Sequence, residues 1–239
     1  KHPTVELALG RDLVLELTET QADYDTKVLE YFQQEIEHKN ANPSYQMVDW
    51  IWMANTSKTT AYLGKSLQKV RDQLGLTNVQ MITNTWGFDE MLYGLCGSPC
   101  VGIVHGILPF KAYVDASDDL KALHNKWRAV DAAADADAEL PGSYENVRYV
   151  QGHVSVLMWK TAVERVVDSG IPVTGENLRA ALEGFRDVPM FNLSAAVSFT
   201  SADHRPQSTV SFYKIGAGGT IVHEPPERTI SLQPSWLGW

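Results

Sequence analysis

The sequence predicts an α/β fold in which helices flank a parallel, doubly wound sheet. Through residues 1–107, short apolar runs typical of strands alternate with longer runs whose apolar residues repeat at helical spacing. Strands that alternate with helices in this way pair in parallel, with right-handed crossovers between them. The second half differs, because helical runs dominate it up to residue 185 and strand-like segments follow.

Composition limits the kinds of partner. The chain has 239 residues and a formal net charge of −9, which allows one large or two small domains. No basic stripe is present, which argues against nucleic acid as a partner. No apolar run reaches the roughly 18 residues that a membrane span needs. Because Lys1–Thr4 resembles neither a signal peptide nor a natural N-terminus, we expect any targeting segment to have been removed or to lie outside this sequence.

The first predicted elements are short. Residues 5–13 fit either a strand or a helix, and we favour the tail of a helix that ends near Gly10. Residues 14–17 read as a short strand. Asp25 is a residue type that commonly caps helices, so we expect a helix from there to about His38.

A strand followed by a polar loop is the central feature. Residues 46–53 read as a buried strand, and Ala54–Ser57 forms a small polar loop that opens a helix. That helix is expected to run to Leu74, with apolar residues at intervals of 4, 3 and 4: Leu63, Leu67, Val70 and Leu74. Gly75 suits a left-handed C-terminal cap.

The remaining elements follow in order. In the first half we expect strands at 79–83 and 101–107, with a short helix at 88–95 between them. In the second half we expect helices at 118–130, 145–169 and 174–185, then strands at 196–200, 208–215 and 220–223. The acidic segment 131–139 reads as a solvated helix end or loop. Gly216–Gly219 lies between two strands, so it is a hairpin turn rather than a nucleotide-binding motif.

No motif in the sequence indicates an enzyme. Gly-x-Ser-x-Gly, His-Glu-x-x-His and P-loop patterns are all absent. Glu35 and Glu37 do not face one another on the predicted helix, so we interpret them as surface charges. His105 lies within a strand and is expected to be a core or cleft histidine rather than a base. We therefore expect no catalytic residue and no cofactor or metal.

The loops at the ends of the strands carry the candidate binding residues. In an open α/β sheet, ligands bind where parallel strands end and helices begin. The hydroxyl, amide and indole groups there suit a polar ligand with an apolar or aromatic part. An equally good alternative is that these residues only cap helices and turns. The candidates are Asn55, Thr56, Ser57, Asn84, Thr85 and Trp86.

Cys96 and Cys100 are the two cysteines of the chain. They flank a short Gly-Ser-Pro segment, so a disulfide is possible in an oxidising compartment. Two small apolar residues at a helix end explain the pattern equally well. Metal binding is the weaker reading, since no histidine stands nearby at ligand spacing.

Several local patterns resemble one known family. They are the helix start Ala22–Asp25, the helix opening Tyr149–Gly152, the helix Thr174–Leu182, the strand and turn Val197–His204, and the tail Trp236–Trp239. Their order and spacing over nearly the whole chain resemble the type I (branched-chain amino acid, Leu/Ile/Val-binding) periplasmic solute-binding proteins of ABC transporters.

The resemblance implies two α/β lobes that close on a ligand by hinge motion. Residues 1–107 would form most of the second lobe, 108–205 the later, mainly helical part of the first, and 206–239 strands that return to the second. The family's N-terminal portion has no counterpart here. We therefore expect incomplete lobes, with the missing segment as a possible separate chain, because bare helix faces would otherwise expose a large apolar surface.

The resemblance also bears on the ligand. Amino-acid binders of the family place a carboxylate after the third of these strands, where Thr85 stands here. A buried ammonium without a partner is costly, which weakens an amino-acid ligand. Trp86 favours a ligand with an aromatic or extended apolar part, unless it packs between the lobes instead. The start of the first-lobe helix adds Tyr149 and His153 as candidates.

The function that the resemblance implies is capture of a small molecule and its delivery to the membrane permease of an ABC transporter. The expected location is periplasmic or extracellular, by secretion or a lipid anchor. The alternative is a ligand-sensing regulatory protein of the same fold, which two free cysteines and a cytoplasmic start would favour.

Overall fold

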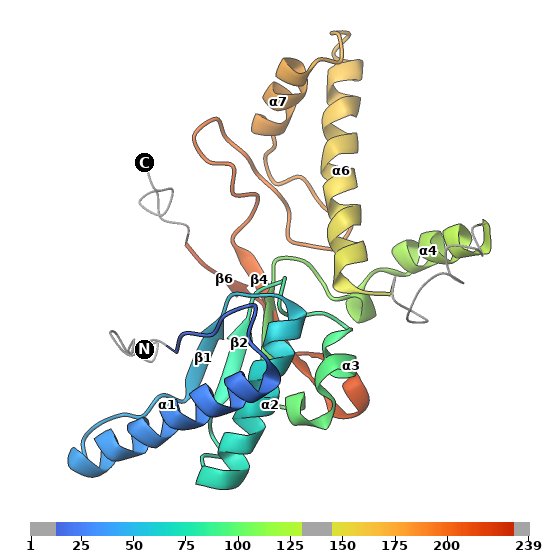
Figure 1. Ribbon diagram of the computed structural model, residues 1–239. Coiled ribbons are helices and arrows are strands. Elements are labelled where there is room, and N and C mark those ends of the chain that lie inside the picture. Colours follow the sequence, from blue (N-terminus) through green and yellow to red (C-terminus); the bar gives the residue numbers. More distant parts are fainter. Residues whose placement is uncertain (1–12, 131–144, 232–239) are drawn as a thin grey trace. The chain divides into compact units, whose positions relative to one another are not determined.

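The computed structural model describes residues 13–130 and 145–231 (Figure 1). The helix tail expected before residue 13 and the acidic segment 131–139 lie outside the described residues. The described residues divide into two compact units, one of residues 13–106 and 214–222, the other of residues 107–130, 145–213 and 223–231. We call them the first and second unit and describe each by itself.

A parallel sheet forms the centre of the first unit, as predicted. Its strands are β1 (Trp50–Met53), β2 (Gln80–Thr83) and β3 (Val104–Leu108). β1 pairs in parallel with β2, and β2 with β3. The strand order continues through β4 (Thr209–Ile215) and β5 (Ile221–His223).

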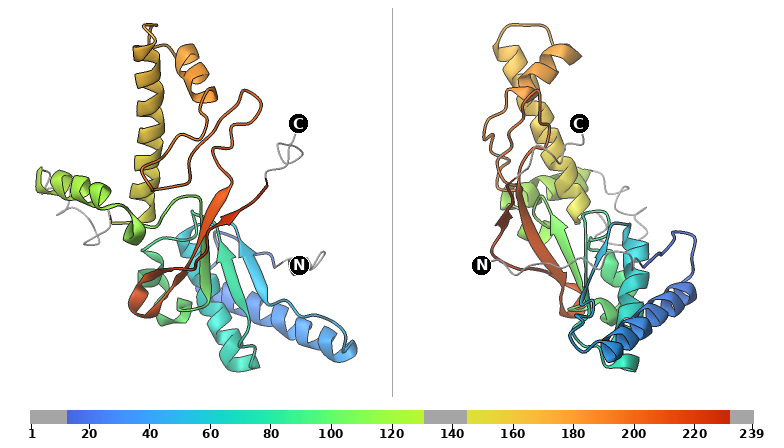
Figure 2. Two further views of the ribbon diagram at one scale, coloured as in Figure 1. Left: turned by 180° about the vertical axis from the view of Figure 1, so that it is seen from behind. Right: turned by 90° about the vertical axis from the view of Figure 1, so that its left-hand side faces the viewer.

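Helices pack on one face of this sheet. They are α1 (Gln21–Ala41), α2 (Ser57–Leu74) and α3 (Leu92–Cys96), followed by the 3-10 turn η1 (Ser98–Cys100). α1 packs along α2, and the view from behind shows the strands in front of both helices (Figure 2, left). The 4-3-4 stripe of α2 is confirmed at Leu63, Leu67 and Val70, which are fully buried. Gly75 ends α2 in the left-handed conformation, as predicted.

The start of α1 corrects one prediction. Thr20, not Asp25, is its N-cap, and Thr20 forms a capping box with Asp23. Asp25 lies inside the helix, where it accepts hydrogen bonds from Ser66 (2.7 Å) and Gln21 (2.9 Å). Threonine and aspartate are both capable N-caps, and the bonds of Asp25 to Ser66 and Gln21 explain why Asp25 serves packing instead.

Two strand predictions are also corrected. Residues 14–17 have an apolar pattern but form no strand, and Val14 and Leu17 are exposed. A strand needs a neighbouring strand to complete its backbone hydrogen bonds. The strand expected at 46–53 begins only at Trp50, and it is not buried, since Trp50 and Trp52 are 46% and 57% exposed.

The segment before β1 is instead held by Glu35, a buried residue rather than the predicted surface charge. Its carboxylate accepts bonds from the Tyr45 hydroxyl (2.9 Å) and the Val48 amide (2.9 Å).

The second unit is mainly helical up to residue 183, as predicted. Its elements are η2 (Tyr113–Asp115), α4 (Asp118–Val130), α6 (Val147–Asp168), α7 (Gly175–Glu183) and β6 (Arg228–Thr229), which pairs antiparallel with the start of β4. α6 packs against α7, and Thr174 is the N-cap of α7. The strand expected at 196–200 is wrong, because Val197 makes only an isolated bridge to Val188.

The hairpin turn predicted at Gly216–Gly219 is confirmed. It contains the short 3-10 turn η3 (Ala217–Gly219), and the Gly216 amide donates to the Thr220 carbonyl (2.7 Å) between β4 and β5. Across the described ranges, no helix has the length and apolar character to cross a membrane.

Candidate ligand-binding site

Two loops of the first unit lie at the same edge of the sheet. Residues 54–56 follow β1 and residues 84–87 follow β2, and these two strands pair in parallel. A Cβ atom added to Gly87 would lie 2.9 Å from the Asn55 carbonyl oxygen and 2.0 Å from Thr83 Oγ1. The two loops therefore touch at Gly87, where only a residue without a side chain fits. We call them the strand-end loops.

A buried hydrogen bond joins the helix that opens after the first loop to the segment that follows the second. Ser57 Oγ donates to Asp89 Oδ2 (2.7 Å), and the Trp86 carbonyl lies 3.4 Å from the same hydroxyl. The other oxygen of Asp89 accepts the Met91 amide (3.1 Å). Because Asp89 is buried and both its oxygens are engaged, it is a structural carboxylate and not an exposed partner for a cationic ligand.

Both asparagine candidates serve the shape of their own loops. Asn55 Oδ1 accepts the Thr56 amide (2.8 Å), and Asn84 Oδ1 accepts the amides of Trp86 (3.1 Å) and Gly87 (3.3 Å). These bonds are the capping and turn roles that the sequence left as an alternative.

The groups at the surface of the loops come from the threonines and the tryptophan. Thr56 is exposed at the N-cap of α2 and makes no side-chain cap bond, and Thr85 is half-buried. The Trp86 side chain is 58% exposed. Together these loops offer an indole and two hydroxyls, a combination of apolar area and hydrogen-bonding groups that suits small organic ligands.

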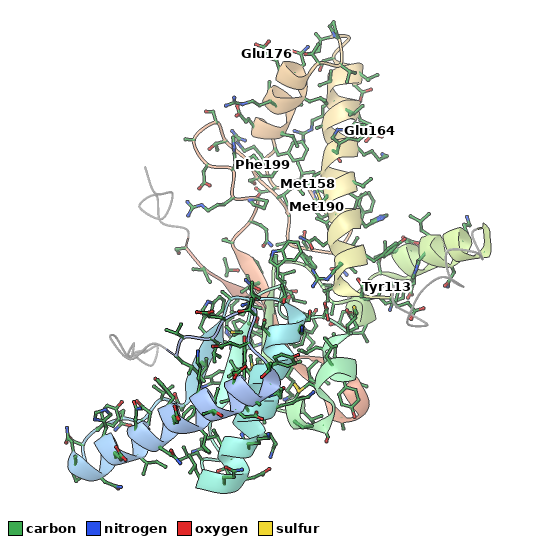
Figure 3. The ribbon with its side chains drawn as sticks, in the orientation of Figure 1. Tyr113, Met158, Glu164, Glu176, Met190 and Phe199 are labelled. Atoms are coloured by element: carbon green, nitrogen blue, oxygen red, sulfur yellow. A yellow bond between two sulfur atoms is a disulfide. The ribbon has the colours of Figure 1, made fainter. Side chains whose placement is uncertain are left out.

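The second unit contains a cluster of aromatic and imidazole rings that includes the other two candidates. Tyr149 and His153 lie one turn apart on α6, with ring centroids 6.4 Å apart and nearly parallel planes. His124 on α4 lies 4.4 Å from the Tyr149 ring and is hydrogen-bonded through Nδ1 to the Tyr113 hydroxyl (2.8 Å). Tyr113 lies beside the start of α6 (Figure 3). Burial raises the pKa of Tyr149 and lowers the pKa of His153.

Sequence reasoning missed Tyr113 and His124. His124 stands four residues after the buried Leu120 on α4, so the helical spacing placed it on the apolar face. Tyr113 lies in a segment for which the sequence predicted no element, and only the fold brings it to His124.

A polar pocket of about 400 Å³ in the second unit contains none of the predicted residues. Asp187, Ser198, Asp203 and Arg205 are among the residues that line it. Arg205 binds both oxygens of Asp203, and this pairing lowers the pKa of Asp203 to about 2. The charges of Asp203 and Arg205 offset each other, and Asp187 adds a second carboxylate to the lining.

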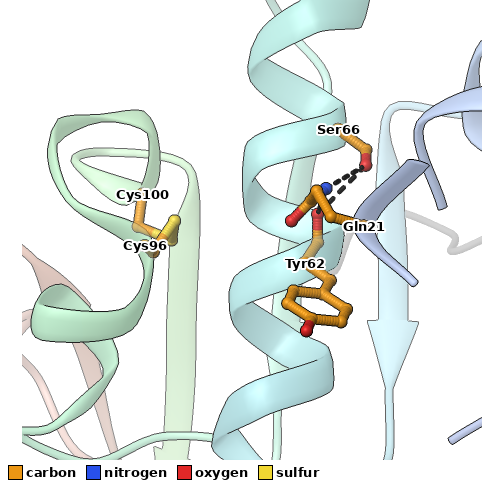
Figure 4. The surroundings of a disulfide bond; sticks show 5 residues. All are labelled: Gln21, Tyr62, Ser66, Cys96 and Cys100. Atoms are coloured by element: carbon orange, nitrogen blue, oxygen red, sulfur yellow. Dashed lines mark hydrogen bonds between the residues drawn. A yellow bond between two sulfur atoms is a disulfide. The ribbon is translucent and has the colours of Figure 1, made fainter. Parts of the chain in front are cut away.

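The structure joins Cys96 and Cys100 in a disulfide with Cα atoms 5.8 Å apart (Figure 4). The bridge packs on α2 at Gly64, where an added Cβ would lie 2.6 Å from Cys100 Sγ and 3.3 Å from Cys96 Sγ. Within the ranges described, no group of three or more His, Cys, Asp or Glu side chains could hold a metal ion.

Solved structures share the fold. A substrate-binding protein of an ABC transporter from Aeropyrum pernix is 24% identical and matches over 91% of this chain and 51% of its own, with a TM-score of 0.66. The chain has the fold of ABC transporter substrate-binding proteins. Two further examples are a branched-chain amino acid ABC transporter protein from Thermus thermophilus with bound valine (16% identity, 87% and 50% coverage, TM-score 0.59) and a fatty acid ABC transporter substrate-binding protein from Thermomonospora curvata (15%, 83% and 47%, 0.56).

The likeness to substrate-binding proteins is therefore one of fold, as the sequence motifs predicted. No family model matches the chain, and no curated protein does. This chain spans about half the length of the substrate-binding proteins it matches.

Proposed function

We propose that the chain is part of an extracytoplasmic solute-binding protein that captures a small molecule and delivers it to an ABC permease. The shared fold carries this proposal: the solved proteins are named as substrate-binding proteins of ABC transporters, and one holds valine. In this proposal, the first unit is most of the second lobe and the second unit is the later part of the first lobe.

The strand-end loops form the ligand-contacting surface of the first unit in this proposal. Thr56, Thr85 and Trp86 contact the ligand, while Asn55, Ser57 and Asn84 hold the loops in shape. Tyr149 and His153 are the candidate ligand contacts of the second unit, taken by itself. No residue has a catalytic role.

The ligand has an apolar part that contacts the Trp86 indole. The Asp89 carboxylate is engaged on both oxygens by Ser57 and the Met91 amide, and the candidate residues of the loops themselves offer hydroxyls rather than a carboxylate to a ligand ammonium. This favours an apolar carboxylic acid or a neutral molecule over a free amino acid. A fatty acid is one compound class named among proteins of this fold.

The Cys96–Cys100 disulfide supports an extracytoplasmic location over the cytoplasmic regulator, because disulfides persist in oxidising compartments.

Ligand binding to matched compounds tests the proposal. Calorimetry would compare valine, leucine and isoleucine with the corresponding acids that lack the amino group and with a medium-chain fatty acid. Both this chain and the product of the full reading frame that contains it would be measured. We expect an apolar acid to bind, and Trp86→Ala to weaken it.

Trp159→Ala is the matched control, since Trp159 on α6 is 59% exposed, like Trp86, but lies far from the strand-end loops in sequence. Equal loss in both variants would remove Trp86 from the site. If no compound binds either protein, the solute-binding proposal fails for these ligand classes.

A further inference from the structure

Two segments of the sequence match the acceptor pattern for N-linked glycosylation. The pattern is asparagine, then any residue except proline, then serine or threonine. It occurs at Asn55–Ser57 and at Asn192–Ser194, whereas Asn42–Ser44 is excluded because Pro43 stands in its middle position. The structure gives the two matching segments very different surroundings.

Asn192 lies at the tip of a turn in the second unit. The Leu193 amide donates to the Met190 carbonyl (2.9 Å), and the side chains of these two residues are buried. Between them, Phe191 and Asn192 have positive φ angles of 49° and 60°, as in a type I′ turn. Both residues are exposed, so the turn carries its asparagine on the surface of the unit.

The nitrogen atom that would carry a sugar is free at this turn. Asn192 Oδ1 accepts a bond from Lys111 Nζ (2.9 Å), but no described residue bonds to Asn192 Nδ2. Ser194 is half-buried, and its hydroxyl donates to the carbonyl of its neighbour Ala195 (2.9 Å). A sugar on Asn192 Nδ2 would therefore displace no hydrogen bond among the described residues.

The other segment is built into the first unit. Ser57 is buried and its hydroxyl donates to Asp89 Oδ2 (2.7 Å), so the third position of the pattern is engaged. Asn55 is half-buried, and its Oδ1 accepts the Thr56 amide (2.8 Å). Asn55–Ser57 therefore matches the pattern in sequence, but not in the accessibility that sugar transfer needs.

We propose that Asn192 is a site of N-linked glycosylation. The donor is an oligosaccharide joined to a lipid through a diphosphate. A bond forms between Asn192 Nδ2 and the C1 atom of the first sugar, while the bond from C1 to the diphosphate oxygen breaks. The lipid diphosphate leaves with the electron pair, and the amide nitrogen gives up one proton.

The inference rests on the extracytoplasmic location proposed above, because the acceptor pattern is used in secreted proteins. N-linked sugars are bulky and solubilising surface groups. Phe191 is 67% exposed at the same turn, and a sugar on the next residue would shield this apolar ring from solvent.

Mass spectrometry of the protein purified from the organism that encodes it tests the proposal. The peptide that contains Asn192 should be heavier than its sequence by one oligosaccharide, and the peptide that contains Asn55 should have its sequence mass. Asn192→Gln and Ser194→Ala should each remove the added mass. Ser194→Thr retains the acceptor pattern and should keep it. Because two of these variants change the same side chain, a difference between them reports the pattern and not the fold.

The disulfide separates failure of this proposal from failure of the proposed function. An unmodified Asn192 in protein whose Cys96 and Cys100 are bridged overturns the glycosylation alone. Free thiols together with an unmodified Asn192 overturn the extracytoplasmic location as well. Sugar on Asn55 in place of Asn192, or sugar that persists on Asn192 in Ser194→Ala, also overturns the proposal.

Discussion

Ser57 donates a buried 2.7 Å hydrogen bond to Asp89, and this bond connects the first turn of α2 to the segment that follows the loop after β2. The negative carboxylate stands at the N-terminal end of α2, where the helix dipole favours it. Two loops that approach within contact distance at Gly87 are thus fixed by a residue pair 32 positions apart in sequence. The geometry of the candidate site depends on this pair.

Ser57→Ala should destabilise the fold. The substitution leaves one oxygen of the buried Asp89 without its hydroxyl donor, which costs about 1–3 kcal/mol in the free energy of unfolding. Urea denaturation would measure it. Ser155→Ala is the control, because Ser155 is exposed on α6 and bonds only to the Gln151 carbonyl of its own helix. Equal losses of unfolding free energy in the two variants would show that the Ser57–Asp89 bond contributes no more stability than the exposed bond of Ser155.

Gly87→Ala should also destabilise the fold, for a steric reason. The new methyl would lie 2.0 Å from Thr83 Oγ1 and 2.6 Å from Thr60 Oγ1, so backbone or side chains must move. Overpacking of this kind costs about 1–3 kcal/mol. Gly94→Ala is the matched control, since nothing lies within 4 Å of its added Cβ and it sits inside α3. Thermal unfolding of the pair decides, and a stable Gly87→Ala protein would refute the close approach.

The disulfide should be measurable in solution. Without reductant, the two thiols of the purified protein should resist alkylation, and the intact mass should rise after reduction and alkylation. Opening so short a loop removes about 2 kcal/mol of stability in the chain-entropy account. The Cys96→Ser/Cys100→Ser variant is the control, because reductant should not change its melting temperature. Alkylation of both cysteines without reductant would contradict the bridge.

Local sequence signals predicted much of the first unit. The apolar spacing of α2 and the Gly75 cap depend on residues close in sequence, and the alternation of strands with helices indicates parallel pairing, so all three could be predicted. Whether residues 14–17 form a strand, and whether Trp50 and Trp52 are exposed, depends on which strands and helices lie beside them. Their apolar pattern is that of a buried strand whatever covers it, and periodicity alone does not reveal the cover.

The candidate site was predictable to the same extent. The strand-end rule indicated both loops, and residue type indicated that asparagines could shape them. The engagement of Asp89 by Ser57 and the approach of His124 to Tyr149 join residues far apart in sequence. Such pairs follow from tertiary packing, so the sequence left open whether each polar group faces ligand or protein.

His153 should make stability depend on pH below neutrality. Burial lowers its pKa in the folded protein relative to the ordinary value of about 6.5. Between these two pKa values, His153 binds more protons in the unfolded chain than in the folded protein. The contribution of His153 to the free energy of unfolding is therefore complete above about pH 6.5 and decreases as the pH falls toward the folded pKa. His153→Gln should therefore flatten the stability profile between about pH 7.5 and 5.5, as measured by urea denaturation across that range. His38→Gln is the control substitution, because His38 is exposed near the end of α1. A profile that stays as steep in His153→Gln as in the parent would show that another group titrates, and that His153 is not desolvated in the folded chain.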